Sequence, residues 1–205
     1  MASFDDTSVA RQRADFTREN SVNIGAIASA SAGKVVPIEY GNHFLHQTLL
    51  TFLALPVVTG NTTGASFGSK QIYTFPEGRI YVISNVVYFG QITFNAAAGG
   101  AGDISQTGSG DFSMGTTATA DATLAGTDVD LLPSTPMLDP FVAGVGRSNA
   151  GAFLAAAAFF DGTATAKSLY LNVIIDDAAV ADAVSNDNVY FTGTARITWQ
   201  WLGDY

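Results

Sequence analysis

The sequence predicts an all-β protein, a single β-sandwich or jelly-roll-like domain with an extended N-terminal arm. Three observations predict this fold class. Apolar and polar residues alternate in several runs, as strands with one buried face require. Gly, Asp, Thr and Ser separate these runs at short intervals, which is typical of turns between strands. Helix signals are sparse, since only 13% of the 205 residues are charged and every acidic residue after position 96 is Asp, a turn-former.

The first forty residues show no sustained period, so we expect residues 1–40 to form the arm and residues 41–205 the domain. Ser8–Asn20 carries only a thin apolar stripe for a short helix, and Ser21–Gly33 is rich in small residues. Two interpretations stay open for this segment: an extended arm that becomes ordered beside a partner, or a frayed terminus with no role.

A first pair of strands is expected around a proline–glycine turn. Gln71–Phe75 and Arg79–Ser84 flank Pro76-Glu77-Gly78, whose proline and glycine suit a tight hairpin turn. Val86–Phe94 follows as a second β run, rich in Val, Ile, Tyr and Phe.

A second hairpin is expected where Ala152–Phe160 and Ser168–Ile175 flank a loop that begins with Asp161-Gly162. The later run has one mostly buried face, formed by its alternating apolar residues Leu169, Leu171, Val173 and Ile175. Between the two hairpins, residues 99–140 are too long and polar for a hairpin loop. We expect them to cross one end of the sandwich and to carry a short strand or two.

The clearest strand is the last. From Val189 to Trp201 the odd-numbered positions are apolar or glycine, and the even-numbered positions between them are mostly polar. This period of two predicts one face inside the domain and one face in water. Ala178–Val184, capped by Asp176 or Asp177, is the remaining candidate for a short helix.

Composition excludes several functions. The chain has no Cys, so disulfides, thiolate metal sites, iron–sulfur clusters and thiol nucleophiles are ruled out. A net charge of −9 and a pI near 4.3 argue against a nucleic-acid partner. The chain begins with an acidic, polar segment, and no apolar run reaches the roughly 18–20 residues of a membrane span. We expect no membrane association, no cofactor, and synthesis in a cytoplasm.

Two groups of side chains are candidate metal ligands. His43 and His46 lie three positions apart, but in a strand such residues face opposite sides, which favours ordinary strand-edge histidines. A loop-like region supplies oxygen ligands of the kind that calcium prefers, without the spacing or the glutamate of an EF-hand. Its carboxylates, for which turn capping is the favoured interpretation, are Asp103, Asp111, Asp121, Asp128 and Asp130. We assign no metal-binding residue.

Catalytic motifs fail on their context. Thr107-Gly108-Ser109-Gly110 lacks the first glycine of a nucleophile elbow. Gly144-Val145-Gly146 is followed by Asn149 where a dinucleotide-binding loop needs its third glycine. The pair Asp176-Asp177 fits a capped turn better than an acid–base pair. We therefore predict no enzyme activity and assign no catalytic or cofactor-binding residue.

Aromatic side chains have two interpretations. Trp199 and Trp201 share one face of one strand, so both belong to the core or both to a sugar-binding platform. The other candidate platform residues are Tyr73, Tyr81, Tyr88 and Phe89. The apolar alternation that leads to the tryptophans favours the core.

The Gly-, Ser- and Thr-rich run Asp103–Asp121, together with Ser168–Asp176 and the closing Val189–Tyr205, resembles virion structural proteins of tailed phages. The resemblance is one of texture, covers about half of the chain, and transfers no functional residue. It implies a non-enzymatic capsid decoration or cement protein on the capsid surface. The implied partners are the major capsid protein and further copies of the chain, most commonly in a homotrimer.

The apolar run Phe44–Val58 contains more hydrophobic surface than one sandwich hides, and we expect part of it to close a subunit interface. Two other function classes stay open. One is a phage tail or fibre protein that attaches to a host surface glycan, which requires exposed aromatic rings. The other is a β-sandwich enzyme acting on polysaccharide, which requires an acidic pair in a cleft.

Overall fold

The computed structural model describes residues 25–27, 31, 33–41, 45–62, 65–95, 109–137, 158–176 and 187–203. These residues are all-β, as the sequence predicts, with a short 3-10 turn, η2 (Gly126–Asp128), and no α-helix in the part that is described. The strands are β1 (Val35–Gly41), β2 (Leu45–Thr62), β3 (Ala65–Thr74), β4 (Gly78–Asn95), β5 (Ser109–Gly115), β6 (Leu132–Pro136), β7 (Ala158–Gly162), β8 (Ser168–Asp176) and β9 (Asp187–Trp201).

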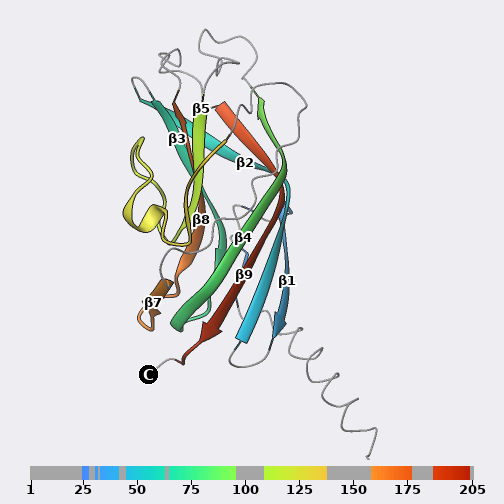
Figure 1. Cartoon of the computed structure of the whole chain (residues 1–205), viewed down its shortest axis with the longest axis vertical. Coiled ribbons are helices and arrows are strands. Elements are labelled where there is room, and N and C mark those ends of the chain that lie inside the picture. Colours follow the sequence, from blue (N-terminus) through green and yellow to red (C-terminus); the bar gives the residue numbers. More distant parts are fainter. Residues whose placement is uncertain are drawn as a thin grey trace, which may run out of the picture.

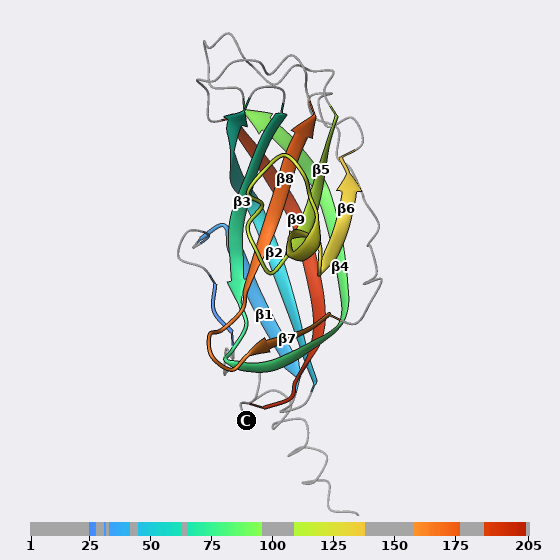
Figure 2. The same ribbon diagram turned by 90° about the vertical axis from the view of Figure 1, so that its left-hand side faces the viewer.

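The strands pair antiparallel in one curled sheet with the order β6-β5-β8-β3-β2-β9-β4-β7, and β1 pairs with β2. We call β1, β2, β9, β4 and β7 the β9 half, and β3, β8, β5 and β6 the β8 half. The halves join where Gly60–Thr62 of β2 pairs with Ala65–Phe67 of β3. In Figures 1 and 2, β1, β2, β9 and β4 run side by side and the β8 half lies across the core from them.

β9 is the central strand of its half, because it pairs with β2 along one edge and with β4 along the other. Its predicted alternation is confirmed: the odd-numbered residues Val189, Phe191, Ala195, Ile197 and Trp199 are buried, and the positions between Val189 and Trp201 that alternate with them are partly or fully exposed. Gly193 interrupts the apolar face because a Cβ there would meet the backbone carbonyl of Tyr88.

β4 corrects the expectation of two separate β runs between Arg79 and Phe94. It is one strand of 18 residues with register shifts between Val82 and Ser84 and between Phe89 and Gln91. An extra residue at a bulge shifts which side chains face inward. Here the two bulges keep apolar residues such as Ile80, Val87 and Ile92 on the buried face along the whole strand.

Two aromatic clusters hold the halves together. In the first, Phe112 of β5 contacts Phe89 of β4 and Phe191 of β9, with ring centroids 5.2 and 6.2 Å apart. In the second, Phe75, which follows β3, contacts Trp199 of β9 edge-on at 5.5 Å. Such edge-to-face pairs add to the hydrophobic gain from burying the rings, so the contacts fix how the sheet curls as well as how stable it is.

The hairpin predicted around Pro76-Glu77-Gly78 is wrong, although the chain does bend there and Gly78 adopts a φ of 122°. β3 pairs with β2 and β8, whereas β4 pairs with β9 and β7. The connection crosses from the β8 half to the β9 half. It does so because Phe75 stays in the core against Trp199 instead of turning outward.

The hairpin predicted at Asp161-Gly162 is also wrong. These residues end β7, where they lie opposite Arg79 and Gly78 of β4. The next strand, β8, pairs with β3 and β5 instead. Phe160 of β7 is directed into the core, where its ring contacts that of Phe75 at 5.3 Å.

Part of the segment predicted as an arm belongs to the sheet. β1 spans the predicted boundary at residue 40, its Val35 is buried in the core, and Ala26 forms an isolated bridge with Thr74 of β3. A deletion of residues 1–40 therefore removes core packing, and a deletion that tests the arm must end at residue 24. Residues 1–24 and the candidate helix Ala178–Val184 lie outside the described residues.

The long region expected at 99–140 contributes two strands to the β8 half. β5 pairs with β8, and β6 forms the edge of the sheet beside β5. The segment between them, residues 116–131, carries η2 and loops over the outer side of β8 (Figure 2). The expectation of a short strand or two in this region is confirmed.

The two faces of β9 make a test of the fold. Replacing Phe191 by Ala leaves a cavity between β9, β4 and β5, and we expect the free energy of unfolding to fall by about 3–5 kcal/mol. The matched control Thr192→Val alters the next residue of β9, whose side chain faces outward, and should change the free energy of unfolding by less than about 1 kcal/mol. Denaturant titration measures both, and equal losses from the two variants would contradict the assignment of faces.

Candidate functional site

The large exposed hydrophobic side chains of the described residues belong to one half of the sheet. Ten large hydrophobic residues are exposed among the described residues, and all lie in the β9 half or directly after it. They are Val36, Ile38 and Tyr40 of β1, Leu45, Leu53 and Val58 of β2, Ile83 and Tyr88 of β4, Phe159 of β7, and Leu202 after β9. The part of Phe44–Val58 that was expected at the surface is thus Leu45, Leu53 and Val58.

The strand registers place five of these ten side chains, those of Val36, Ile38, Tyr40, Leu45 and Tyr88, in adjacent rows on the outer surface of the sheet. One row runs Val36, Thr51, Thr194, Tyr88, and the next runs Ile38, Leu49, Arg196, Val86. Two further rows run Tyr40, Gln47, Thr198, Ser84 and then Leu45, Gln200, Tyr81. We call these four rows the outer apolar face. Its one charged side chain is Arg196.

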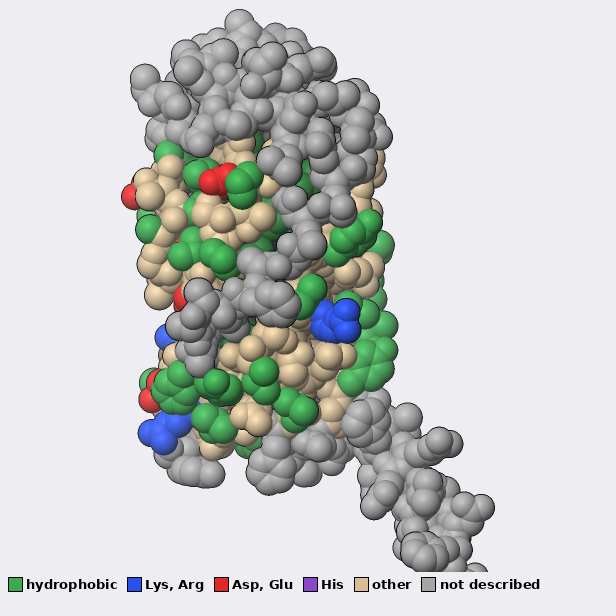
Figure 3. All heavy atoms as spheres, viewed as in Figure 1, with side chains coloured by type: hydrophobic (Ala, Val, Ile, Leu, Met, Phe, Trp, Pro, Cys, Tyr) green, Lys and Arg blue, Asp and Glu red, His purple; other side chains and the backbone are tan. Residues whose placement is uncertain are grey.

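The opposite side of the protein is acidic. Asp111, Asp121, Asp128 and Asp130 all lie on β5 or in the segment between β5 and β6. In Figure 3, acidic side chains appear at the upper left and at the lower left, and hydrophobic side chains lie along the right-hand edge and also at the lower left. The β8 half has no large exposed hydrophobic residue among those described.

The Asp residues of this region hydrogen-bond to neighbouring threonines and serines. Asp130 accepts from the backbone N–H and the hydroxyl of Thr116 at 2.9 and 2.6 Å. Burial of its carboxyl raises the pKa of Asp130, and the Thr116 hydrogen bonds oppose that shift. Asp128 accepts from the Thr117 hydroxyl, and Asp121 accepts from the N–H of Thr123 at 2.8 Å in an Asx turn.

These carboxylates were candidate calcium ligands, and the structure uses them as caps of turns and loops. Asp111 lies apart from the others and accepts from the Ser134 hydroxyl of β6. In the described ranges, no three His, Asp or Glu side chains come together as a metal ion requires. Asp103 lies outside those ranges.

Asn172 of β8 fixes the acidic segment to the sheet. Its side chain is fully buried on the outer side of β8, where the sequence predicts an exposed residue. Its amide donates to the carbonyls of Thr117 and Asp128 at 3.1 and 3.0 Å. Its oxygen accepts from the N–H of Thr119 and from the Ser69 hydroxyl. One side chain therefore joins β8 and β3 to both ends of the covering segment.

A cluster of buried polar and aromatic side chains is formed by residues of β1, β2, β3 and β9. The Tyr73 hydroxyl donates to the Glu39 carboxylate, and the Trp199 indole N–H donates to the Thr48 hydroxyl at 2.9 Å. His46 stacks on Trp199 with ring centroids 4.3 Å apart. All five side chains are at most 5% exposed, so the cluster is closed to solvent.

The Tyr73–Glu39 contact bridges the region where β2 and β3 diverge below their shared tip. Burial, and then the Glu39 carboxylate, raise the pKa of Tyr73 well above its ordinary value of 10.0. The neighbouring segment crosses the same gap, since the Ser31 hydroxyl donates to the Gln71 carbonyl at 2.6 Å. These contacts close the sheet where strand pairing does not.

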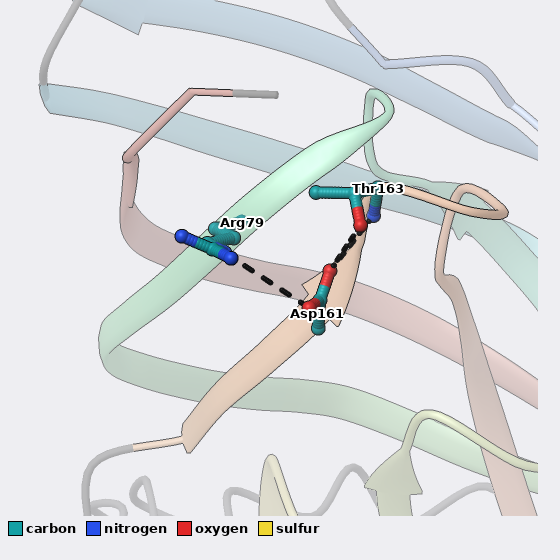
Figure 4. Close-up of polar contacts among 3 residues, drawn as sticks. All are labelled: Arg79, Asp161 and Thr163. Atoms are coloured by element: carbon teal, nitrogen blue, oxygen red, sulfur yellow. Dashed lines mark hydrogen bonds and ion pairs between the residues drawn. The ribbon is translucent and has the colours of Figure 1, made fainter. Parts of the chain in front are cut away.

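A small polar group marks the end of β7. The Asp161 carboxylate accepts from the N–H and hydroxyl of Thr163 at 3.0 and 2.6 Å, and it lies 3.9 Å from Arg79 Nε (Figure 4). The Thr163 hydrogen bonds lower the pKa of Asp161, with a smaller effect from Arg79. Both partners of the ion pair are about half exposed, and exposed pairs of this kind contribute little to stability.

The histidine and aromatic candidates divide between core and surface. His46 is a buried residue of β2, which lies between β1 and β9, not a residue at a sheet edge, and His43 lies outside the described residues.

Trp199, Tyr73 and Phe89 belong to the core, as the core interpretation predicts, and Trp201 packs against it. Tyr88 is exposed and Tyr81 partly so, so the proposed platform is not one surface.

Several sequence candidates lie outside the described residues: Thr107, Gly108, Gly144-Val145-Gly146, Asn149 and Asp177. Ser109, Gly110 and Asp176 are strand residues of β5 and β8. Sequence analysis missed Glu39, Thr48 and Asn172 as buried residues. No local signal marks Glu39, because the apolar residues of β1, Val36, Ile38 and Tyr40, are the ones that face outward.

No helix within the described ranges has the length and hydropathy of a bilayer span. Comparison of the chain with protein-family models, with curated proteins and with solved structures gives no match. The class of protein is therefore set by the geometry: an all-β protein with one apolar outer face and one acidic side.

Asn172→Ala tests how the acidic segment is attached. The substitution leaves the partners at Thr117, Thr119 and Asp128 without their side-chain bonds, and we expect a loss of about 2–4 kcal/mol in the free energy of unfolding. Amide hydrogen exchange of residues 116–130 should accelerate more than that of β9. The matched control Ser69→Ala, which keeps the Asn172 bonds to Thr117 and Asp128, loses only about 1 kcal/mol. Unchanged exchange in Asn172→Ala would contradict the anchoring role.

Alkaline pH tests the buried tyrosine. Above about pH 10 the unfolded chain releases the Tyr73 proton while the folded protein keeps it, so this contribution to stability is complete below pH 10 and is lost as the pH rises. The free energy of unfolding should fall by up to ~1.4 kcal/mol per pH unit from this residue. Denaturant titrations from pH 9 to pH 11.5 should show a shallower fall for Tyr73→Phe than for the unaltered protein, and parallel curves would contradict the assignment.

Proposed function

We propose that this protein is a non-enzymatic virion structural protein, a capsid decoration or cement protein that binds and stabilises a phage head lattice. The single observation that carries the proposal is the division of the surface into an outer apolar face with one charge, Arg196, and an acidic side over β5 and β6. A protein that sits on a particle needs one surface for its neighbours and another that stays in water.

The acidic side suits the role of the water-facing surface. Its carboxylates and the net charge of −9 disfavour contact with nucleic acid and with other negatively charged particles. The apolar outer face suits the role of the contact surface, because contiguous exposed apolar patches mark interaction sites. The proposed partners are the major capsid protein and further copies of the chain, and the proposed location is the capsid surface of the virion.

The interior supports a structural role. The side chains best equipped for acid–base chemistry, Glu39, His46 and Tyr73, are enclosed in the core, where no substrate reaches them. Polar residues used in this way fix strand positions, as Thr48 does for Trp199. A β-sandwich or jelly-roll arrangement is part of the proposal, and the aromatic contacts between the β9 and β8 halves support it.

Co-sedimentation tests the proposed function. The purified chain is mixed with empty shells assembled from the major capsid protein encoded in the same genome, and we expect it to pellet with them at a saturating ratio. Because apolar contacts are screened little by salt, binding should persist at 0.5 M NaCl. A chain that stays in the supernatant at every ratio would refute the proposal, and binding to a glycan array instead would favour the tail or fibre alternative.

A deletion ending at residue 24 keeps β1 and the Ala26–Thr74 bridge. If the first residues act as an arm on a neighbour, this variant should show the unaltered melting temperature and at least about tenfold weaker binding to shells. Unchanged binding would leave the arm without a role.

A further inference from the structure

We propose that Arg196 selects the partner of the outer apolar face by pairing with a carboxylate that the partner's surface presents at the centre of the contact. The inference rests on the proposed function, in which that partner is the major capsid protein, and it adds the residue and the chemistry on which recognition depends. Three features support it: the position of Arg196, its surroundings without acidic groups, and the small size of the face.

Arg196 lies in the middle of the outer apolar face. It belongs to β9, the central strand, and the register flanks it with Leu49 of β2 and Val86 of β4. Cross-strand neighbours of this kind have their Cβ atoms about 5 Å apart, so aliphatic side chains border Arg196 on two sides. Its neighbours on the same face of β9, Thr194 and Thr198, are partly exposed, and Arg196 itself is exposed. A partner that covers the face therefore covers this charge.

The surroundings of Arg196 provide no opposite charge. Arg79, the other arginine of the described β9 half, lies 3.9 Å from the Asp161 carboxylate. The four rows around Arg196 contain no Asp or Glu. A guanidinium that loses its water on binding must gain a counter-charge, because burial of an unpaired charge opposes association. A partner surface without an acidic group at this point is selected against.

The size of the face gives this pair its weight. With about 4.8 Å between strands and about 3.4 Å per residue, the four rows cover roughly 460 Å². A stable interface buries ~800 Å² on each partner, and nearly half of the side chains in the rows are polar. Apolar burial in these rows alone gives a weak contact, so the charged group at its centre decides which surfaces bind.

A carboxylate is the anion that fits this position. The guanidinium presents planar N–H donors that match the two oxygens of an Asp or Glu side chain. The adjoining row adds uncharged donors, the side chains of Gln47, Thr198 and Ser84, for the remaining lone pairs. Nucleic-acid phosphates also suit arginine, but the net charge of −9 repels a polyanion far more than it repels one carboxylate within a protein surface.

Charge reversal at Arg196 tests the pair in co-sedimentation with capsid shells. Arg196→Glu should weaken binding at least about a hundredfold. Arg196→Lys keeps the charge without the planar donors and should weaken binding about tenfold or less. The matched control Arg79→Glu changes the net charge by the same amount outside the rows, and it should bind as the unaltered chain does. Melting temperatures of the variants identify any folding defect.

Cross-linking gives a second measurement that does not require the charge-reversed variant to fold. A carbodiimide activates a carboxylate, which a touching lysine amine attacks to form an amide, and the reagent leaves as a urea that has taken up the water. In Arg196→Lys bound to shells, mass spectrometry should find position 196 joined to an Asp or Glu of the capsid protein. The unaltered chain is the control, because its guanidinium does not react and should give no link at this position.

The outcomes separate this inference from the proposed function. If the unaltered chain does not pellet with shells, the decoration role and the inference both fail. If it pellets and folded Arg196→Glu pellets equally well, or if Arg79→Glu loses as much binding, the decoration role stands and the selecting role of Arg196 is overturned. A link from position 196 to another copy of this chain, with none to the capsid protein, would also overturn the inference.

Discussion

The pairing of β9 with β2 on one edge and β4 on the other is the constraint on which the other features of the structure depend. It sets three long strands in register, so that between the bulges of β2 and β4 every second residue faces the same core. The inward rings of Phe191 and Trp199 then meet Phe112 and Phe75 from the β8 half. Those contacts determine how far the sheet curls and hold the two halves at a fixed separation.

The same strand pairing determines which side chains form the outer surface of the β9 half. Once alternate residues of β9 are committed to the core, the residues between them and their partners on β1, β2 and β4 must face outward together. Outward Thr194, Thr198 and Gln200 are expected in such a strand, but Ile38, Leu49 and Tyr88 are not. Hydrophobic residues on both faces of one half, beside a β8 half whose outer side is covered by its own chain, give the protein its asymmetry.

The segment that covers the outer side of β8 is held in place by buried polar groups. Asn172 lies on the outer side of β8, where alternation places a residue in water, and it is buried instead because it binds both ends of the segment between β5 and β6. The segment in turn carries the Asp residues. This buried amide, together with the hydrogen bond from the Ser113 hydroxyl to the Asp128 carbonyl and those from Thr116 to Asp130, holds the segment that carries the carboxylates over the sheet.

By itself the sequence determined the all-β class, the strand at Val189–Trp201 with its buried face, the core position of Trp199, and an excess of apolar residues within Phe44–Val58. These follow from local period and composition, which a single strand carries alone. Only the tertiary structure decided which strands pair, why Pro76-Glu77-Gly78 and Asp161-Gly162 join strands of different halves, and which apolar residues face outward together. Pairing is a contact between distant segments, and the packing of Phe75 against Phe160 in the core is one such contact, which no local turn signal records.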